Sequence, residues 1–311
     1  MRTAFEDSKT KCVFSSEWDT HSQKTYEANF GVIPFGDITK IDEKTIPKHN
    51  ILLAGFPCQP FSMIGKREGL DHKTQGNLFF DILRILKYCK PDAFLLENVP
   101  GLLTIDKGET FKLMVGELKK LGYSVDHKVL NASDFSLPQT RKRLYIVGMR
   151  EGLHFFHFPE EKKKKVFINE ILEDDPQGYT ISKRLQKSYI FKANDGHPQI
   201  VDKNSQCFAK TLVASYHKIQ RITGTFVKGG ETGLRLLSET ECKRLMGFSD
   251  DFIVPVSRTQ MYRQFGNSVA IPVVASIAQN MKKALRQSEE QKKTDVISCD
   301  SSNCDKCLIA V

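Results

Sequence analysis

Ile51-Leu52-Leu53-Ala54-Gly55-Phe56-Pro57-Cys58-Gln59-Pro60-Phe61-Ser62 joins an apolar run to a proline-framed loop that carries a single cysteine. The run 51–55 is short, apolar and ended by glycine, which predicts a buried strand. Ligands of open α/β sheets bind outside the C-terminal ends of strands, so Cys58 lies where a site would be built. A lone cysteine is more often a buried structural residue, and its interpretation therefore depends on the neighbouring segments.

Apolar runs alternate with helical patterns on either side of this stretch. The periodicity predicts a helix over 77–88, a strand over 93–97, a helix over 111–121, and strands over 123–130 and 143–148. Alternation of this kind is typical of parallel βαβ units. We therefore expect an open α/β sheet within a first domain, residues 1–150.

The pattern changes after Arg150. Residues 151–234 begin with a charged run and continue with mixed polar and glycine-containing segments, which predicts a second, smaller domain of irregular structure. Residues 235–286 contain a helix over 238–245, opened by the capping-box pair Ser238 and Glu241, and a last helix over 269–286. The polar tail, residues 287–311, is expected to be disordered.

Composition narrows the classes of protein that the chain can belong to. A net charge of +9 over 311 residues favours a polyanionic partner, although excess lysine and arginine can also be solvated surface. The eight cysteines are scattered, which is a poor match to a secreted disulfide framework and favours the cytoplasm. Cys304 and Cys307, with Cys299 nearby, have no second pair and no neighbouring histidine, so no metal site is expected.

Two further motifs place polar groups near Cys58. Glu97-Asn98-Val99-Pro100 ends the next predicted strand, so a carboxyl group and a thiol face one crevice. A nucleophile and an acid are what addition to an aromatic ring requires. Gln139-Thr140-Arg141-Lys142-Arg143 precedes another strand and is either a charged strand entry or a clamp for phosphates and bases.

These motifs together resemble, in order and spacing, those of the DNA cytosine-C5 methyltransferases, and the resemblance covers nearly the whole chain. It implies a Rossmann-like, S-adenosylmethionine-dependent catalytic domain followed by a smaller target recognition domain. It also implies methylation of cytosine in duplex DNA for restriction-modification, through a Cys58 adduct on a flipped base. The implied catalytic residues are Cys58, Glu97, Arg141 and Arg143, and the implied DNA-binding residues are Gln59, Ser62, Gln139, Thr211 and Leu212.

The resemblance extends to the cofactor. Val13 to Trp18 is similar to the family's second strand, whose Glu17 binds ribose while Trp18, the only tryptophan, stacks on adenine. Gly36-Asp37-Ile38 is similar to the element that receives the adenine amino group. The implied cofactor-binding residues are Glu17, Trp18, Asp37, Ile38, Pro57, Leu78, Asn267, Ser268 and Val269.

One departure from the family concerns the beginning of the chain. Members open with a strand and a Phe-x-Gly-x-Gly-Gly loop that holds the methionine end of the cofactor, whereas this sequence starts just beyond that loop. We expect weaker cofactor binding and an exposed sheet edge. Either Met1 is an internal methionine, or a second polypeptide supplies the strand, or the product is inactive.

Two other functions remain open at this point. One branch of the family acts on transfer RNA, and the residues of these motifs do not exclude an RNA cytosine-C5 methyltransferase. The other is an inactive or partner-dependent DNA-binding subunit, because the glycine-rich loop is absent from the sequence. We expect a monomer when the protein is complete. The recognised DNA sequence cannot be predicted from these residues.

Overall fold

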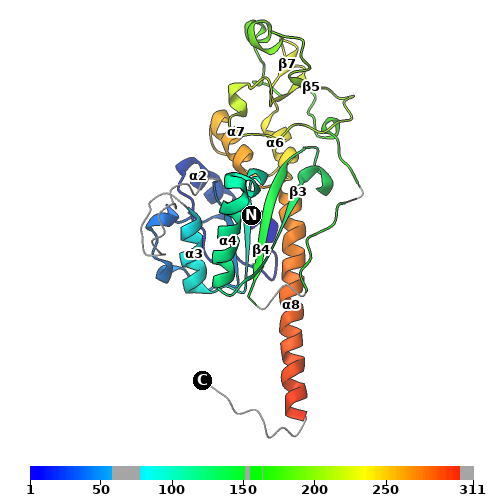
Figure 1. Cartoon of the computed structure of the whole chain (residues 1–311). Helices are drawn as coiled ribbons and strands as arrows, with labels where there is room; N and C mark the ends of the chain where they lie inside the picture. Colours follow the sequence, from blue (N-terminus) through cyan, green and yellow to red (C-terminus); the bar gives the residue numbers. More distant parts are fainter. Residues whose placement is uncertain (58–77, 151–154, 163, 302–311) are drawn as a thin grey trace.

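A computed structural model describes residues 1–57, 78–150, 155–162 and 164–301, with side chains up to 291. A four-stranded sheet in the order β1-β2-β4-β3 forms its base (Figure 1). The strands are β1 Ile51–Gly55, β2 Ala93–Asn98, β3 Ser124–Asn131 and β4 Lys142–Met149. The four predicted strands of the sheet are thus confirmed, with ends that differ by at most one residue.

The sheet is mixed, which corrects the expectation of parallel βαβ units throughout. β1 and β2 are parallel, but β4 runs antiparallel to both β2 and β3. Parallel neighbours need a crossover of a dozen or more residues. Only the segment 132–141 joins β3 to β4, so these two strands pair antiparallel.

Helices cover both faces of the sheet. The amphipathic helices α3, Leu78–Cys89, and α4, Glu109–Lys120, pack on one face through a core that includes Phe79, Met114 and Ile146. α8, Ile271–Ser301, packs on the other face, where Val274 and Ile277 meet strand residues such as Val147. The result is an α/β sheet with helices on both faces, and the helices predicted over 77–88 and 111–121 form one of the two helical layers.

α8 is longer than expected. The sequence predicted that the helix ends near Arg286 and that residues 287–311 are disordered, but α8 continues to Ser301 and extends beyond the sheet (Figure 1). The stretch 273–301 contains neither glycine nor proline, and residues 287–293 are rich in glutamate, glutamine and lysine, which are strong helix formers. Intrinsic helix propensity therefore favours continuation of the helix beyond Arg286.

The N-terminal segment contains two helices, α1, Arg2–Phe5, and α2, Thr20–Phe30. α2 was not predicted because its apolar residues are too few to form a stripe, but Asp19 caps its first turn. The strand expected over 13–18 is reduced to one parallel bridge between Ser16 and Phe35. Among the described strands, β1 pairs only with β2.

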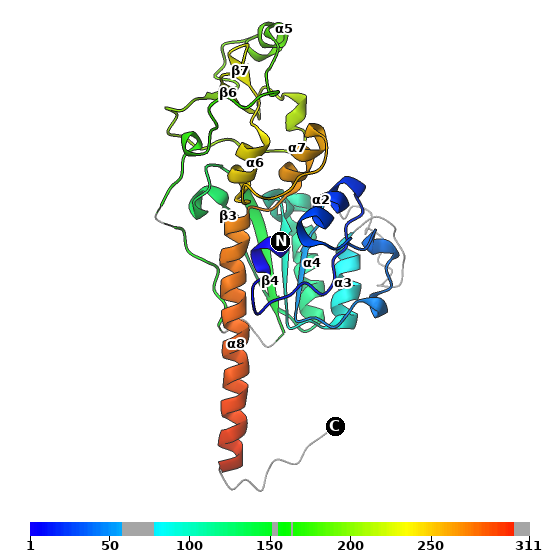
Figure 2. The same ribbon diagram turned by 180° about the vertical axis from the view of Figure 1, so that it is seen from behind.

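The smaller region lies beyond one end of the sheet (Figure 2). Its three-stranded sheet contains β5 Gln199–Val201, β6 Thr225–Lys228 and β7 Leu234–Arg235. The helices α6, Glu239–Met246, and α7, Arg258–Asn267, share its hydrophobic core, and the short helix α5 is Lys183–Leu185. The predicted capping box at Ser238 and Glu241 is confirmed.

Short turns complete the secondary structure. The 3₁₀ turns span Ile38–Lys40, Glu43–Thr45, Pro100–Leu103, Ile105–Gly108, Ala132–Phe135, Ile168–Glu170 and Tyr216–Lys218, and a π turn spans Gln186–Ile190. No helix within the described ranges is long and apolar enough to cross a membrane.

A buried ion pair joins β7 to α6. Arg235 donates from Nη1 and Nη2 to the two carboxylate oxygens of Glu241, each at 2.8 Å, and both side chains are almost fully buried. The backbone N–H groups of Glu173 and Ser238 also donate to this carboxylate, each at 2.8 Å. Glu241 thereby fixes three chain segments at once.

We expect Glu241→Gln to lower the free energy of unfolding by about 3–5 kcal/mol, because Arg235 is left buried without a counter-charge. Urea unfolding measures the change. Glu239→Gln on the same helix is the matched control: its pair with Lys243 is partly exposed and is worth at most about 1 kcal/mol. Equal stabilities of the two variants would contradict this account of the pair.

Candidate active site

The ends of β1 and β2 meet at the candidate site. Gly55 and Glu97 are register partners, and a β-carbon placed on Gly55 would lie 3.6 Å from Glu97 Oε2. The Glu97 carboxyl group therefore lies over the end of β1, from which the chain continues through Phe56 and Pro57 towards Cys58. Pro57 is exposed and is the last described residue there, whereas Cys58, Gln59 and Ser62 lie outside the described residues.

Asn98 anchors the start of this loop. Its side chain is buried, and Nδ2 donates to the Phe56 carbonyl at 3.0 Å while Oδ1 accepts from the Val99 N–H at 2.8 Å. The two strand ends are thereby tied together two residues before Cys58. Sequence reasoning did not assign Asn98 a role, although an amide next to Glu97 at a strand end is a signal for such an anchor.

Glu97 and Arg143 form an ion pair in which Arg143 Nε lies 3.2 Å from Glu97 Oε1. Burial raises the pKa of Glu97, and the positive charges of Arg143 and then Arg141 oppose this increase. A raised pKa keeps more of the carboxyl group protonated near neutral pH. The group can then donate a hydrogen bond or a proton to a ligand at the strand ends.

Arg141 and Gln139 are buried, at 2% and 0% exposure, and both bind backbone groups. Arg141 donates to the carbonyls of Leu212, Gly266 and Ser268. Burial lowers the pKa of Arg141 to about 10, so the guanidinium stays charged at neutral pH. In this structure the first two members of the predicted Gln-x-Arg-x-Arg element contact the protein interior, and Arg143 alone faces Glu97.

The predicted base-contacting dipeptide lies beside this element. Thr211 is half-buried and its Oγ1 donates to the Thr140 carbonyl at 2.6 Å. Leu212 is buried, and its N–H donates to Gln139 Oε1 at 2.8 Å. Thr211 and Leu212, from the smaller region, are thus hydrogen-bonded to Gln139 and Thr140, which immediately precede β4.

The predicted adenosine-binding residues lie on the N-terminal segment. Trp18 is 71% exposed, and Glu17 is half-buried, with a pKa raised by burial. Asp37 caps the turn that begins at Ile38, and its hydrogen bonds from Thr39 lower its pKa. Leu78 opens α3 and packs partly against the core.

The predicted C-terminal cofactor segment joins α7 to α8. Asn267 ends α7 and is exposed, Ser268 is its C-cap, and Val269 is buried. Thr25 in α2 donates to Gln264 in α7 at 2.8 Å, so the helix that follows Trp18 is attached to the helix that ends at Asn267. The two predicted groups of cofactor-binding residues thus adjoin helices that contact each other.

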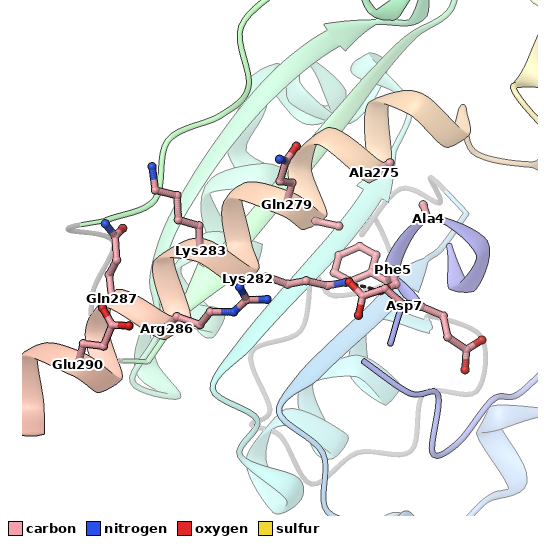
Figure 3. A pocket seen from close by; sticks show the side chains of 12 residues that line it. Ala4, Phe5, Asp7, Ala275, Gln279, Lys282, Lys283, Arg286, Gln287 and Glu290 are labelled. Atoms are coloured by element: carbon pink, nitrogen blue, oxygen red, sulfur yellow. Dashed lines mark hydrogen bonds and ion pairs between the residues drawn. The ribbon is translucent and has the colours of Figure 1, made fainter. Parts of the chain in front are cut away.

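A cavity of about 540 Å³ lies elsewhere, between α1 and α8 (Figure 3). Lys282 lines it and donates to Asp7 at 2.9 Å and to the Phe5 carbonyl. None of the predicted site residues lines this cavity. The candidate active site is instead the open edge formed by the strand ends.

Metal binding has no support from the described side chains, among which no group of three histidine, cysteine or acidic residues is suited to hold an ion. Cys304 and Cys307 lie outside the described residues, and the Cys299 side chain is not among the described ones.

Comparison with known proteins identifies the family. The model of the C-5 cytosine-specific DNA methylases matches residues 1–283. The chain belongs to this family. Among curated members, it is 61% identical over 294 residues to the Type II methyltransferase M.BsuFI of Bacillus subtilis, covering 94% of this chain and 72% of that protein. It is 55% identical to the Type II methyltransferase M.MspI of Moraxella sp., with coverages of 94% and 70%.

Solved structures of methyltransferases have the same fold. The Entamoeba histolytica methyltransferase EhMeth aligns with a TM-score of 0.71 at 23% identity, over 91% of this chain and 94% of that one. The Dnmt2 methyltransferase of S. pombe aligns with a TM-score of 0.67 at 20% identity, with coverages of 88% and 91%. The predicted α/β methyltransferase fold is confirmed, and the chain is a DNA cytosine-C5 methyltransferase by family.

Proposed function

We propose that this methyltransferase transfers a methyl group from S-adenosylmethionine to C5 of a cytosine rotated out of duplex DNA. The observation that carries the proposal is the Glu97 carboxyl group, which lies over the end of β1 with a raised pKa and Arg143 beside it. A stacked base does not expose C5 and C6 to such a site, so the base must leave the helix.

Cys58 is the proposed nucleophile. Its thiolate forms a bond to C6 while Glu97 donates a proton or hydrogen bond to N3, and the C5–C6 π electrons move to C5. S-adenosylmethionine, when bound, would supply an electrophilic methyl group to C5 and leave as S-adenosylhomocysteine. Loss of the C5 proton to a base then restores the double bond, the bond between sulfur and C6 breaks to regenerate the thiolate, and any proton on N3 returns to Glu97.

Arg143 has two proposed roles. It orients the Glu97 carboxyl group through their ion pair, and its positive charge favours the Cys58 thiolate, since nearby cations lower thiol pKa values. Pro57 restricts the loop backbone ahead of Cys58. Among the remaining predicted DNA contacts, Thr211 is described and half-buried near the strand ends, whereas Gln59 and Ser62 belong to the loop outside the described residues.

The cofactor fits the residues of the N-terminal segment. The exposed Trp18 ring offers a free aromatic face to adenine, and the Glu17 carboxylate can accept hydrogen bonds from ribose hydroxyls. Asp37, Ile38 and Leu78 would complete the adenine side, and Asn267 to Val269 would close it from the C-terminal helices. The Type II relatives suggest that methylation protects cellular DNA from a restriction endonuclease, in the bacterial cytoplasm.

We expect Trp18→Ala to weaken cofactor binding by about 1–3 kcal/mol, the usual contribution of one aromatic ring stacked on a base. Calorimetric titration with S-adenosylhomocysteine measures the effect. Phe191→Ala removes another exposed ring, 53% exposed against 71% for Trp18, in the smaller region and is the control. Unchanged cofactor affinity in Trp18→Ala would remove Trp18 from the proposed site.

A methyl-transfer assay tests the function. Cofactor labelled on its methyl group is incubated with the protein and either mixed-sequence duplex DNA or transfer RNA, and the product nucleosides are then separated. The proposal requires label in 5-methylcytosine from DNA. Label in RNA alone, or on another atom of the base, would contradict it.

A further inference from the structure

One buried side chain connects two segments that lie far apart in the sequence. Arg141 Nη1 donates to the Leu212 carbonyl at 2.9 Å, and Nη2 donates to the carbonyls of Gly266 at 2.9 Å and Ser268 at 2.6 Å. A planar guanidinium with several fixed donors suits this task, because it can hold several carbonyls in one geometry. The two segments therefore cannot shift independently without breaking charge-assisted hydrogen bonds.

The same segments touch backbone to backbone. A β-carbon at Gly266 would lie 2.1 Å from Ala214 N and 2.3 Å from the carbonyl carbon of Val213, so any side chain there would collide with main-chain atoms. The φ of Gly266 is not in the left-handed region, so backbone conformation does not require glycine here. The close approach of the two segments does require it. Arg141 thus bridges two segments already in direct contact.

Gln139 holds the first segment from its other side. Its Oε1 accepts from the Leu212 N–H at 2.8 Å, and its Nε2 donates to the Leu245 carbonyl at 3.1 Å. Both backbone groups of Leu212 are therefore fixed by side chains that precede β4. Thr211 and Asn267 flank the contact: Thr211 is half-buried, as is Ser268, and Asn267 is exposed.

We propose that Arg141, Leu212–Ala214 and Gly266–Ser268 form a junction that couples DNA binding to cofactor binding. The inference rests on the proposed function, which assigns Thr211 to the target base and Asn267 and Ser268 to the cofactor. A ligand that orders one segment orders the other through shared carbonyl contacts, so each ligand tightens the binding of the other. Arg141 is a positioning residue in this account, and it does not touch the cytosine.

Hydrogen exchange of the unliganded protein tests the junction itself. In Arg141→Met we expect amide exchange to rise by about tenfold or more in both 211–216 and 264–270, because local opening loses the same contacts in each. Arg221→Met is the matched control. Arg221 is also buried, and it donates to the carbonyls of Ile190 and Ala193 and pairs with Asp195, all within the smaller region.

The coupling is measured by titrating duplex DNA with and without S-adenosylhomocysteine, and the reverse. For the wild-type protein we expect each ligand to tighten the other by the same factor, on the order of tenfold. The factor should approach one in Arg141→Met, be intermediate in Arg141→Lys, which keeps the charge without the fork, and be unchanged in Arg221→Met.

The outcomes separate this inference from the proposed function. Methyl transfer by a wild-type protein whose ligands bind independently would overturn the junction and leave the function intact. Full coupling in Arg141→Met, or faster exchange in only one of the two segments, would also overturn the junction. A wild-type protein that neither binds the cofactor product nor transfers methyl groups would overturn both.

Discussion

Cys58→Ser is expected to reduce methyl transfer to DNA by at least about 10³-fold, the scale of losses found when an enzyme's nucleophile is removed. A serine hydroxyl is a far weaker nucleophile than a thiolate near neutral pH, so addition to C6 becomes very slow. The measurement is the initial rate with labelled cofactor and duplex DNA. Binding of DNA should be retained, because the substitution removes no positive charge.

Cys89→Ser is the control for this experiment. Cys89 ends α3, is half-buried, and lies near the Glu43 carbonyl, away from the strand ends. It should keep its activity if loss of a thiol has no general effect on the fold. Substantial turnover by Cys58→Ser, with normal product, would exclude the covalent mechanism.

Glu97→Gln is the second substitution with a large expected effect, a loss of about 10²–10⁴-fold in turnover, the usual contribution of a general acid. The amide keeps the shape of the side chain but cannot deliver a proton to N3, and it loses the ion pair with Arg143. Glu109→Gln, an exposed position on α4, is the control. If Glu97→Gln turned over at the wild-type rate at every pH tested, an acid role for Glu97 would be excluded.

Although Glu97→Gln is expected to lower activity, it should raise stability relative to the wild type at higher pH. Burial raises the folded-state pKa of Glu97, so its favourable contribution is complete below the unfolded pKa of about 4.3 and is lost as pH rises through the folded value. As pH rises from about 4.5 to about 7.5, the free energy of unfolding of Glu97→Gln should therefore increase relative to that of the wild type. Urea unfolding at the two pH values checks the sign; a difference that falls with pH would contradict it.

The elements that position the site were predictable because their signals are local. The apolar run before Cys58 and the amphipathic pattern of α3 and α4 correspond to the observed strand and helices. The direction of β4 was not predictable from such patterns, because a buried strand has the same apolar sequence whether its neighbours are parallel or antiparallel. The extension of α8 was missed because a polar stretch with high helix propensity resembles a tail when only apolar spacing is considered.

Some contacts of the site residues were predictable from local sequence, and others were not. The motifs singled out Glu97 and Arg143 by residue type and strand position, and the structure places them in an ion pair. Gln139 and Arg141 are charged or polar residues in a basic cluster, which suggested contacts with DNA or with the cytosine. Their burial depends on carbonyls from residues 212, 266 and 268, and no local pattern specifies which distant backbone groups will meet a side chain.

Covalent trapping tests the central claim most directly. Duplex DNA containing 5-fluorocytosine is incubated with the protein and cofactor, and the products are separated under denaturing conditions. After methyl transfer, C5 carries fluorine in place of the proton that must leave, so elimination is blocked and the bond between Cys58 and C6 persists. The account predicts a cofactor-dependent protein–DNA complex whose cross-linked peptide contains Cys58 and which Cys58→Ser does not form. Methylation of ordinary DNA without any trapped complex, or a cross-link through another residue, would contradict it.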